Sequence, residues 1–393
     1  MSARRFHPSR LSTTLTTLAL LSAATLSGCG GGGDADPAAG ISTASGTIEG
    51  FGSIVVNGVR YDDSSARVFD ADETSGSTGV LGLGMVVDVV AGPVQAGASG
   101  APTAVATQVR YRSEVQGPLT AVAGDVLTVL GQSVRIGPAT VFEEGRNATL
   151  QTGRVVEVYG LRDASGQISA TRIDIEDDTD EPYSLQAPIA SLDTVARRFH
   201  IGDAVVVYGS ASAVPAQLAD GDVLRVRLSR TPDASGQWQA TAVRAVGPLA
   251  TDEVAGGVPA DLEGYITRMD SSSRFAIGQV TVDASAARRL PADLAVGSLV
   301  EVDGRWVDGV LLAREVALER RLDADAGFEI DARITALDSS AGTFELRGVV
   351  VDYRGARFED GPATRLAVGV RVEVQGHLAS DGRTLVASVV EFD

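Results

Sequence analysis

The chain has 393 residues, enough for about two to four ordinary domains, and combines 44% hydrophobic residues with only 5% aromatics and 45 glycines. That balance favours short strands and tight turns over large helical cores. The net charge of −18 excludes a nucleic-acid-binding class, while one cysteine and three histidines exclude disulfide frameworks and iron–sulfur sites and leave little for a His-based centre.

Residues 1–28 are predicted to form a lipoprotein signal peptide. Three arginines lie within the first ten residues, an uncharged apolar stretch covers 11–26, and small residues follow. This order is typical of a secretory signal and is too short for a comfortable membrane span. Leu26-Ser27-Gly28-Cys29 resembles the bacterial lipoprotein box, which implies cleavage before Cys29 and lipidation of its thiol. The alternative is an ordinary secreted protein with a chance cysteine.

Residues 29–43 are expected to be a flexible tether that carries the lipidated Cys29. Four glycines follow the cysteine, and Gly-rich chain behaves as coil. In lipoproteins an Asp directly after the cysteine favours inner-membrane retention, and here Gly30 stands there, which resembles the outer-membrane type. We therefore expect a protein anchored in the cell envelope, at the outer membrane and facing either the periplasm or the exterior.

The rest of the chain repeats one pattern five times. An apolar residue, two variable residues and a glycine precede a Val-rich alternating strand, at intervals of 68 to 76 residues. We call these the marker glycines: Gly84, Gly153, Gly221, Gly297 and Gly369. Repetition at a fixed period indicates tandem structural units.

Each unit reads as an opening strand, a hairpin, an irregular loop and two closing strands. Five short strands in about 65 residues favour small OB-like barrels, and the period is too long for a β-solenoid repeat. The fold class is therefore all-β, with about five tandem five-stranded OB-like barrels. The predicted units are 44–112, 113–178, 181–248, 260–321 and 326–392. Residues 313–321 have a helix-like composition but stand in the register of a closing strand.

The first unit carries a motif that resembles a known family. Its run Gly50-Phe51-Gly52-Ser53, followed by Val56-Asn57-Gly58, resembles the opening of a family of bacterial domain-of-unknown-function repeats. The other units keep the marker element and lose Phe-Gly-Ser. Members of that family typically follow a lipoprotein signal and have no established activity, so the resemblance implies location and architecture only.

Few residues in the repeats suggest chemistry. His200 and His377, the two imidazoles left after processing, fall at different places in their units. The fourth residue after each marker glycine is charged, and strand alternation predicts that it lies on a solvated outer face. These residues are Asp88, Glu157, Arg225, Glu301 and Glu373.

Two acidic runs, 70–74 and 174–181, could collect cations, but the first lacks the glycine and closing glutamate of a calcium loop. We assign no catalytic, cofactor or metal residue, and Cys29 is the one predicted modification site.

The predicted function is that of an exported, lipid-anchored, non-enzymatic binding or spacer module. Its expected partners are the membrane, through the anchor, and an envelope protein or glycan, with no nucleic acid. Two alternatives stay open. One is a dedicated oligosaccharide- or divalent-cation-binding protein, and the other is a carboxylate-based hydrolase.

Overall fold

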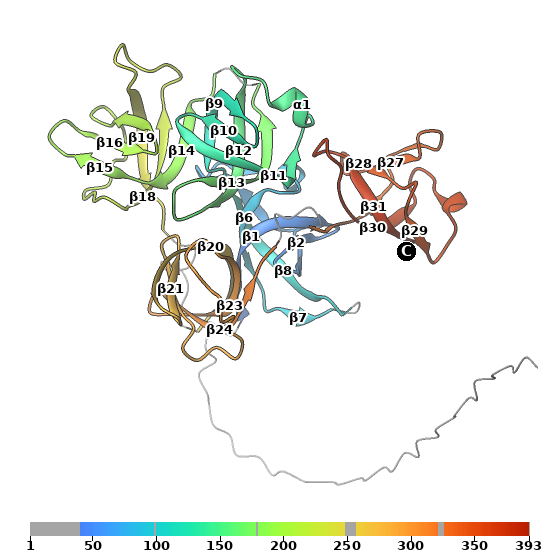
Figure 1. The fold of residues 1–393 in the computed structure, drawn as a ribbon. Helices are drawn as coiled ribbons and strands as arrows, with labels where there is room; N and C mark the ends of the chain where they lie inside the picture. The colour runs from blue at the N-terminus through green and yellow to red at the C-terminus, as the bar shows by residue number, and fades with distance from the viewer. Residues whose placement is uncertain (1–39, 98–99, 178–179, 248–256, 321–325, 393) are drawn as a thin grey trace, which may run out of the picture. The chain divides into compact units, whose positions relative to one another are not determined.

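The computed structural model describes residues 40–97, 100–177, 180–247, 257–320 and 326–392 (Figure 1). The predicted signal peptide, Cys29 and most of the tether lie outside these residues. Residues 37–393 form one compact unit. Within the described chain, no helix is long and apolar enough to cross a membrane.

The second repeat shows the barrel in its simplest form. Its strands are β9 (Val115–Ala123), β10 (Val126–Val129), β11 (Gln132–Phe142), β12 (Val155–Arg162) and β13 (Ile168–Ile175), and the helical turn α1 (Arg146–Thr149) precedes β12. β10 pairs with β9 and β11, β11 pairs in parallel with β13, and β12 closes the sheet between β13 and β9. This order, 1-2-3-5-4-1 with one parallel pair, is a closed five-stranded barrel of the OB type.

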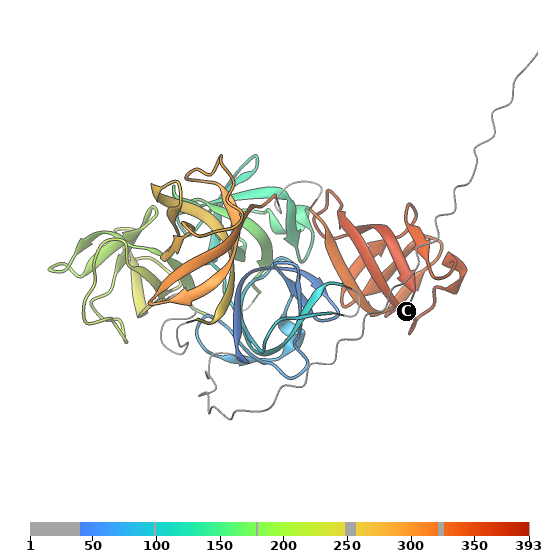
Figure 2. The same ribbon diagram turned by 90° about the horizontal axis from the view of Figure 1, so that it is seen from below.

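The other four repeats share this pairing order, and the prediction of tandem OB-like barrels is confirmed. The first repeat has β1 (Ser42–Phe51), β2 (Ile54–Val56), β3 (Val59–Asp62), β6 (Val86–Ala91) and β8 (Pro102–Tyr111), with short β4 (Arg67–Phe69), β5 (Ser75–Gly76) and β7 (Gln95–Ala96). Figure 2 shows its blue strands curling into a ring.

The third repeat has β14 (Tyr183–Pro188), β15 (Ala190–Asp193), β16 (Arg198–Ile201), β17 (Ala204–Val207), β18 (Val223–Leu228) and β19 (Trp238–Ala245). The fourth has β20 (Pro259–Ser271), β21 (Arg274–Ile277), β22 (Val280–Asp283), β23 (Leu299–Val307) and β24 (Val310–Leu318). The fifth has β25 (Phe328–Arg333), β26 (Ala336–Asp338), β27 (Thr343–Leu346), β28 (Val349–Asp352), β29 (Arg357–Glu359), β30 (Arg371–Leu378) and β31 (Leu385–Phe392). The helix-like run from 313 thus lies largely in β24.

The marker glycines fasten the first strand of each barrel to the fourth. All five have a positive φ, between 79° and 94°, a region that glycine enters without steric cost. Each marker N–H donates to the carbonyl of a buried Ile or Leu in the opening segment, at 2.8–2.9 Å, and that residue's N–H bonds back to the residue after the glycine. The partners are Ile48, Leu119, Ile189, Ile266 and Ile334. The repeated glycine is therefore a backbone requirement of the barrel.

A β-bulge recurs seven residues after each marker glycine, where strand four pairs with strand five. Three repeats place a glycine there: Gly160, Gly304 and Gly376. A Cβ at any of these would run into a backbone carbonyl of the facing strand, namely that of Ser169, Leu312 or Val386. The bulge bends strand four so that the barrel can close.

Opening strands also join one repeat to another. β1 runs parallel to β20, with Ala44 opposite Asp261, and its other end runs parallel to β25. β9 pairs antiparallel with β14. One hydrophobic cluster joins the first and fifth repeats and also takes in Val141, Tyr159 and Leu161 of the second repeat and Leu299 of the fourth. A second cluster joins the second and third repeats, and a third lies within the fourth.

The motif peculiar to the first repeat lies at these junctions. Gly50 and Gly52 lie against Glu329 and Asp331 of β25, where a Cβ would clash. Asn57 occupies the tight β2–β3 turn with φ of 50°, and its side-chain amide donates to Asp261 Oδ1 of β20 at 2.8 Å. The motif therefore forms the β2–β3 turn and also holds the first repeat against the fourth and fifth.

Candidate functional site

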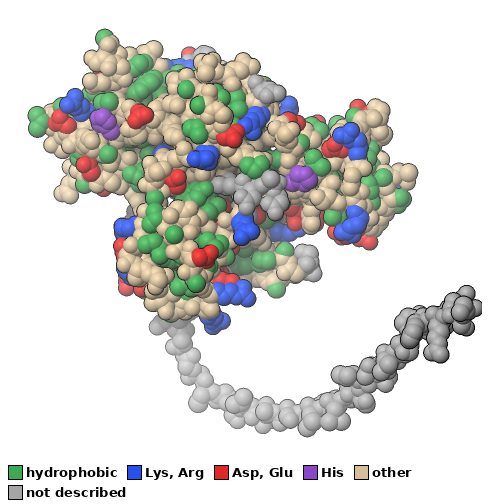
Figure 3. Space-filling view, in the orientation of Figure 1, with side chains coloured by type: hydrophobic (Ala, Val, Ile, Leu, Met, Phe, Trp, Pro, Cys, Tyr) green, Lys and Arg blue, Asp and Glu red, His purple; other side chains and the backbone are tan. Residues whose placement is uncertain are grey.

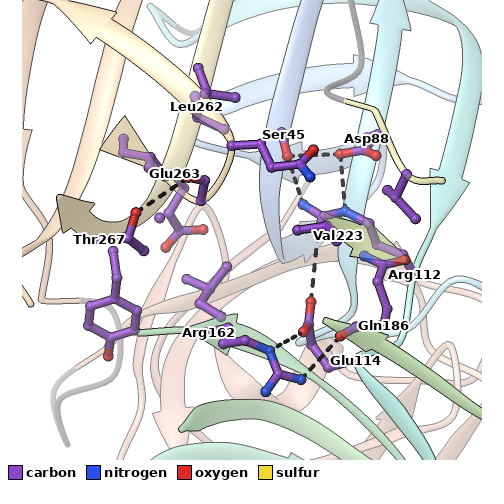
Figure 4. A pocket seen from close by; sticks show the side chains of 18 of the residues that line it. Ser45, Asp88, Arg112, Glu114, Arg162, Gln186, Val223, Leu262, Glu263 and Thr267 are labelled. Atoms are coloured by element: carbon purple, nitrogen blue, oxygen red, sulfur yellow. Dashed lines mark hydrogen bonds and ion pairs between the residues drawn. The ribbon is translucent and has the colours of Figure 1, made fainter. Parts of the chain in front are cut away.

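A cavity of about 230 Å³ opens where the first four repeats meet (Figure 4). Its walls come from β1 and β6, the β12–β13 hairpin, the end of β14, the start of β18, and β20 to β23. No single repeat could form it.

One wall is an ionic network centred on Arg112. Its Nε lies 3.3 Å from Asp88 Oδ1, and its Nη2 donates to Ser45 Oγ at 3.0 Å. Ser45 in turn donates to Asp88 at 2.8 Å. Burial opposes the charge of Arg112, but the carboxylates of Asp88 and Glu114 outweigh it and raise the pKa of the guanidinium. The arginine therefore stays charged at the cavity wall.

The network continues into the second and third repeats. Glu114, at the start of the second repeat, accepts a hydrogen bond from Arg162 Nε at 3.1 Å. Arg162 Nη2 donates to the backbone carbonyl of Gln186 at 3.1 Å. Both side chains are nearly buried, with 9% of Glu114 and 12% of Arg162 exposed. Alternating charges thus neutralise one another along the wall.

The rest of the lining is largely apolar. It includes Leu161, Val223, Ile277 and Val280, together with the aromatic side chains of Tyr265 and Trp306. Trp306 Nε1 donates to Thr43 Oγ1 at 3.3 Å, and the Tyr265 hydroxyl donates to Ser169 Oγ at 3.0 Å. The polar ends of both rings are thus held, so the cavity combines an apolar face with a hydrogen-bonding face.

Gln279 links the third and fourth repeats at the rim. With its NH₂ turned toward Val246, the amide donates to Val246 O and accepts from Val223 N, at 2.9 Å each. The side chain replaces a missing backbone partner at the edge of β18.

A second, more polar cavity of about 310 Å³ lies between the first three repeats. Arg225 Nη1 donates to Ser113 O at 2.7 Å, and its Nη2 lies 3.6 Å from Asp72 Oδ2. Glu157 lines the same cavity and accepts a hydrogen bond from the Tyr159 hydroxyl at 2.9 Å. Burial raises the pKa of Glu157, and its contacts with Ser113, Tyr159 and Arg225 only partly offset that effect.

The structure corrects the expectation of a solvated face at the fourth residue after each marker. Glu157 is half-buried at the second cavity, and only 12% of the Asp88 side chain and 7% of the Arg225 side chain are exposed. Neighbouring repeats cover the outer faces of strands one and four, which alternation within one strand cannot reveal.

The acidic runs make protein contacts. Asp70 Oδ1 accepts from the backbone N–H groups of Asp72 and Thr74, and Asp72 also pairs with Arg227 of the third repeat at 3.2 Å. Asp174 pairs with Arg172 at 2.7 Å. Over the described ranges, no group of three or more His, Cys, Asp or Glu side chains could hold a metal ion.

The two histidines lie in different barrels. His200 is in β16 and half-buried, whereas His377 is exposed in β30. Acidic and basic side chains are interspersed over the face drawn in Figure 3. Cys29, the predicted lipidation site, lies outside the described residues.

Three segments of the chain are similar to one family of known domains. Residues 116–174, 263–317 and 331–391 match the family described as Domain of unknown function (DUF5666). The chain carries tandem domains of unknown function. All three matched DUF5666 segments have Glu four residues and Gly seven residues after the marker, whereas the first and third repeats have Asp88 with Ala91 and Arg225 with Leu228. The Gly50–Gly58 motif lies outside the matched segments.

No curated protein matches the chain. Among solved structures, "drosophila Unr CSD456" is 15% identical and covers 53% of this chain and 97% of its own, with a TM-score of 0.15. A score this low carries no argument, so the OB-type assignment rests on the strand pairings.

Proposed function

We propose that this protein is an exported, lipid-anchored cell-envelope protein whose tandem barrels form a non-enzymatic binding module. The observation that carries the binding role is the 230 Å³ cavity, which four repeats build jointly around a wall of paired charges. Pockets with apolar walls and a few fixed polar groups are the usual form of small-molecule sites.

The anchor rests on Leu26-Ser27-Gly28-Cys29, because the only cysteine of the chain stands at the position where a lipoprotein is cleaved and acylated. Two or three acyl chains hold a protein on a bilayer far more firmly than one. Replacing Cys29 with Ala should release the protein from the membrane fraction and abolish incorporation of labelled palmitate. Ser27→Ala keeps a small residue in the box and is the matched control. Membrane retention of the Cys29→Ala protein with unchanged mobility would contradict the anchor.

The binding role is tested separately by thermal melts of the full chain with divalent cations, a chelator, glycans and peptides. A ligand at about one hundred times its dissociation constant adds about 2.7 kcal/mol, which is readily seen. A flat panel would leave a spacer role and argue against a binding module.

A hydrolase is the second candidate, because Glu157 is a carboxyl of raised pKa at a cavity wall. Such groups cluster at catalytic sites, but structural networks perturb pKa values as well. Tyr159 donates to Glu157, and the neighbouring Asp72 pairs with arginines. These contacts favour a structural role for both carboxyls.

A further inference from the structure

The 230 Å³ cavity has room for one ring. An apolar cavity of about 150 Å³ holds benzene, so this volume suits a six-membered ring with small substituents. The cavity is open to solvent, so such a ring could also be the end of a longer chain.

The lining charges select against an anion. Among the described residues at the wall, five carboxylates face two guanidinium groups: Asp88, Glu114, Asp163, Asp261 and Glu263 against Arg112 and Arg162. Both arginines already pair with carboxylates, so neither is left to bind an incoming negative charge. The other three carboxylates accept hydrogen bonds within the protein, Asp163 from Ser165, Asp261 from Asn57 and Glu263 from Thr47. A cation would have to compete with these donors and with the paired arginines, whereas an uncharged ligand would not.

Gln186 supplies an unused donor and acceptor. The residue is only 6% exposed and lines the cavity, and its side-chain amide makes no hydrogen bond with any residue that the structure describes. Figure 4 shows it beside Arg112 and Glu114. An amide that faces a cavity without a protein partner is available to water or a ligand. The amide therefore points to a ligand that can both donate and accept, as a hydroxyl does.

We propose that this cavity binds a neutral hexose ring, free or at the end of a glycan, with its hydroxyls toward Gln186 and the ionic wall and its apolar face toward Tyr265 and Val280. Planar amide and carboxylate groups pair with adjacent hydroxyls, while the aromatic and aliphatic wall covers the C–H face. This inference rests on the proposed binding role and gives it a ligand class.

The test uses the full chain in a detergent without a sugar headgroup. The chain has two tryptophans, and only Trp306 lines the cavity, so a Trp238→Phe background makes fluorescence report on this site. Methyl glucoside, methyl galactoside and methyl mannoside are titrated, with glucuronic acid as the anionic counterpart. We expect a saturable change with at least one neutral hexoside and at least tenfold weaker binding of glucuronic acid.

Two variants locate the site. Gln186→Leu keeps the volume and removes the amide, and should weaken binding at least tenfold. Val223→Phe fills the cavity and should abolish binding, whereas Val155→Phe, at the equivalent position of the second repeat and away from the cavity, should bind as the parent does. Circular dichroism melts confirm that each variant is folded.

The inference is overturned if no neutral hexoside binds at millimolar concentration, if glucuronic acid binds equally well, or if folded Gln186→Leu and Val223→Phe proteins bind normally. A polysaccharide ending in the same ring, used as competitor, distinguishes a chain terminus from free sugar, and either result supports the ligand class. If no hexoside binds, the proposed function still holds provided that another ligand class raises the melting temperature and Cys29→Ala releases the protein from the membrane.

Discussion

At the residue scale, one strand position takes a different partner in each repeat. Four residues after the marker glycine, Asp88 pairs with Arg112, Glu157 accepts from Tyr159, Arg225 pairs with Asp72, and Glu373 lies 3.4 Å from Arg60 of the first repeat. Glu301 lies opposite Glu263 in the β20–β23 pair. The barrel fold needs no particular residue here. Arg225 and Glu373 therefore contact another repeat, whereas Asp88 and Glu157 bond within their own.

The environment of Glu157 should make the free energy of unfolding depend on pH. Burial raises its pKa above 4.5, so the folded state binds the proton more tightly than the unfolded chain. The free energy of unfolding should therefore fall as pH rises from about 4.5 through the raised folded value. Glu157→Gln keeps the acceptor for Tyr159 and cannot ionise, so the variant should lack this part of the decline. Urea midpoints of both proteins between pH 4 and pH 8 check it; parallel curves would show that Glu157 ionises normally.

At the element scale, the barrel depends on a reciprocal pair of hydrogen bonds between the opening segment and the marker turn. The same geometry occurs at all five markers, although the residues between them vary. The constraint acts on the backbone, because four of the five markers have open space around them: a Cβ at Gly153, Gly221, Gly297 or Gly369 would meet nothing within 4 Å.

Gly369→Ala measures the free-energy cost of a positive φ without a steric clash. Its φ of 91° should make the alanine variant about 1–2 kcal/mol less stable in the fifth barrel. Gly355 lies in the same barrel, also with open space around it but without a positive φ, so Gly355→Ala should be neutral or slightly stabilising. Hydrogen exchange of the β30 and β31 amides measures the stability of the fifth barrel in both variants. Equal losses of protection in the two variants would refute the claim that the positive φ requires glycine at position 369.

Gly84→Ala should cost more than Gly369→Ala. Besides a φ of 79°, its Cβ would lie 2.5 Å from the carbonyl oxygen of Thr171 in the second repeat. The extra loss should be visible in exchange of β13 as well as β6, because the clash acts on both barrels. Protection loss confined to β6 would mean that the two repeats separate freely.

At the scale of the whole molecule, the repeats are joined by polar contacts as well as by strand pairing. Thr47 N donates to Glu263 Oε2 at 2.9 Å across the first and fourth repeats, and Asp72 reaches Arg225 across the first and third. Both acceptor carboxylates are buried by the contact they make. Removing one partner should therefore destabilise more than an exposed ion pair would.

A double-mutant cycle measures the contact between the first and third repeats. Asp72→Asn and Arg225→Met should show a coupling free energy of about 1–3 kcal/mol in urea unfolding, because 11% and 7% of these side chains are exposed. The control pair Asp303 and Arg314, within one barrel and more exposed, should give less than about 1 kcal/mol. Zero coupling for Asp72 and Arg225 would contradict docking of these repeats.

The sequence by itself determined the unit of the fold. Alternating valines, Gly-containing turns and the recurring marker glycine act within about 70 residues, so they predicted all-β barrels and their number without knowledge of the whole. The bulge glycines Gly160, Gly304 and Gly376 were also readable, at a constant seven residues from the marker, but that recurrence was missed. Only the strand pairing explains it, because the bulge is a property of two strands.

Tertiary structure alone decided the site. Ser45, Arg162, Gln186 and Tyr265 belong to four different repeats, and no spacing in the sequence relates them. Strand alternation predicts which side chains of strand four point into their own barrel. It does not distinguish an outward-facing side chain that meets solvent from one that meets a neighbouring repeat. Burial between barrels depends on contacts at long sequence separation, so it changed the interpretation of Asp88, Glu157 and Arg225 and created the cavity that the repeats share.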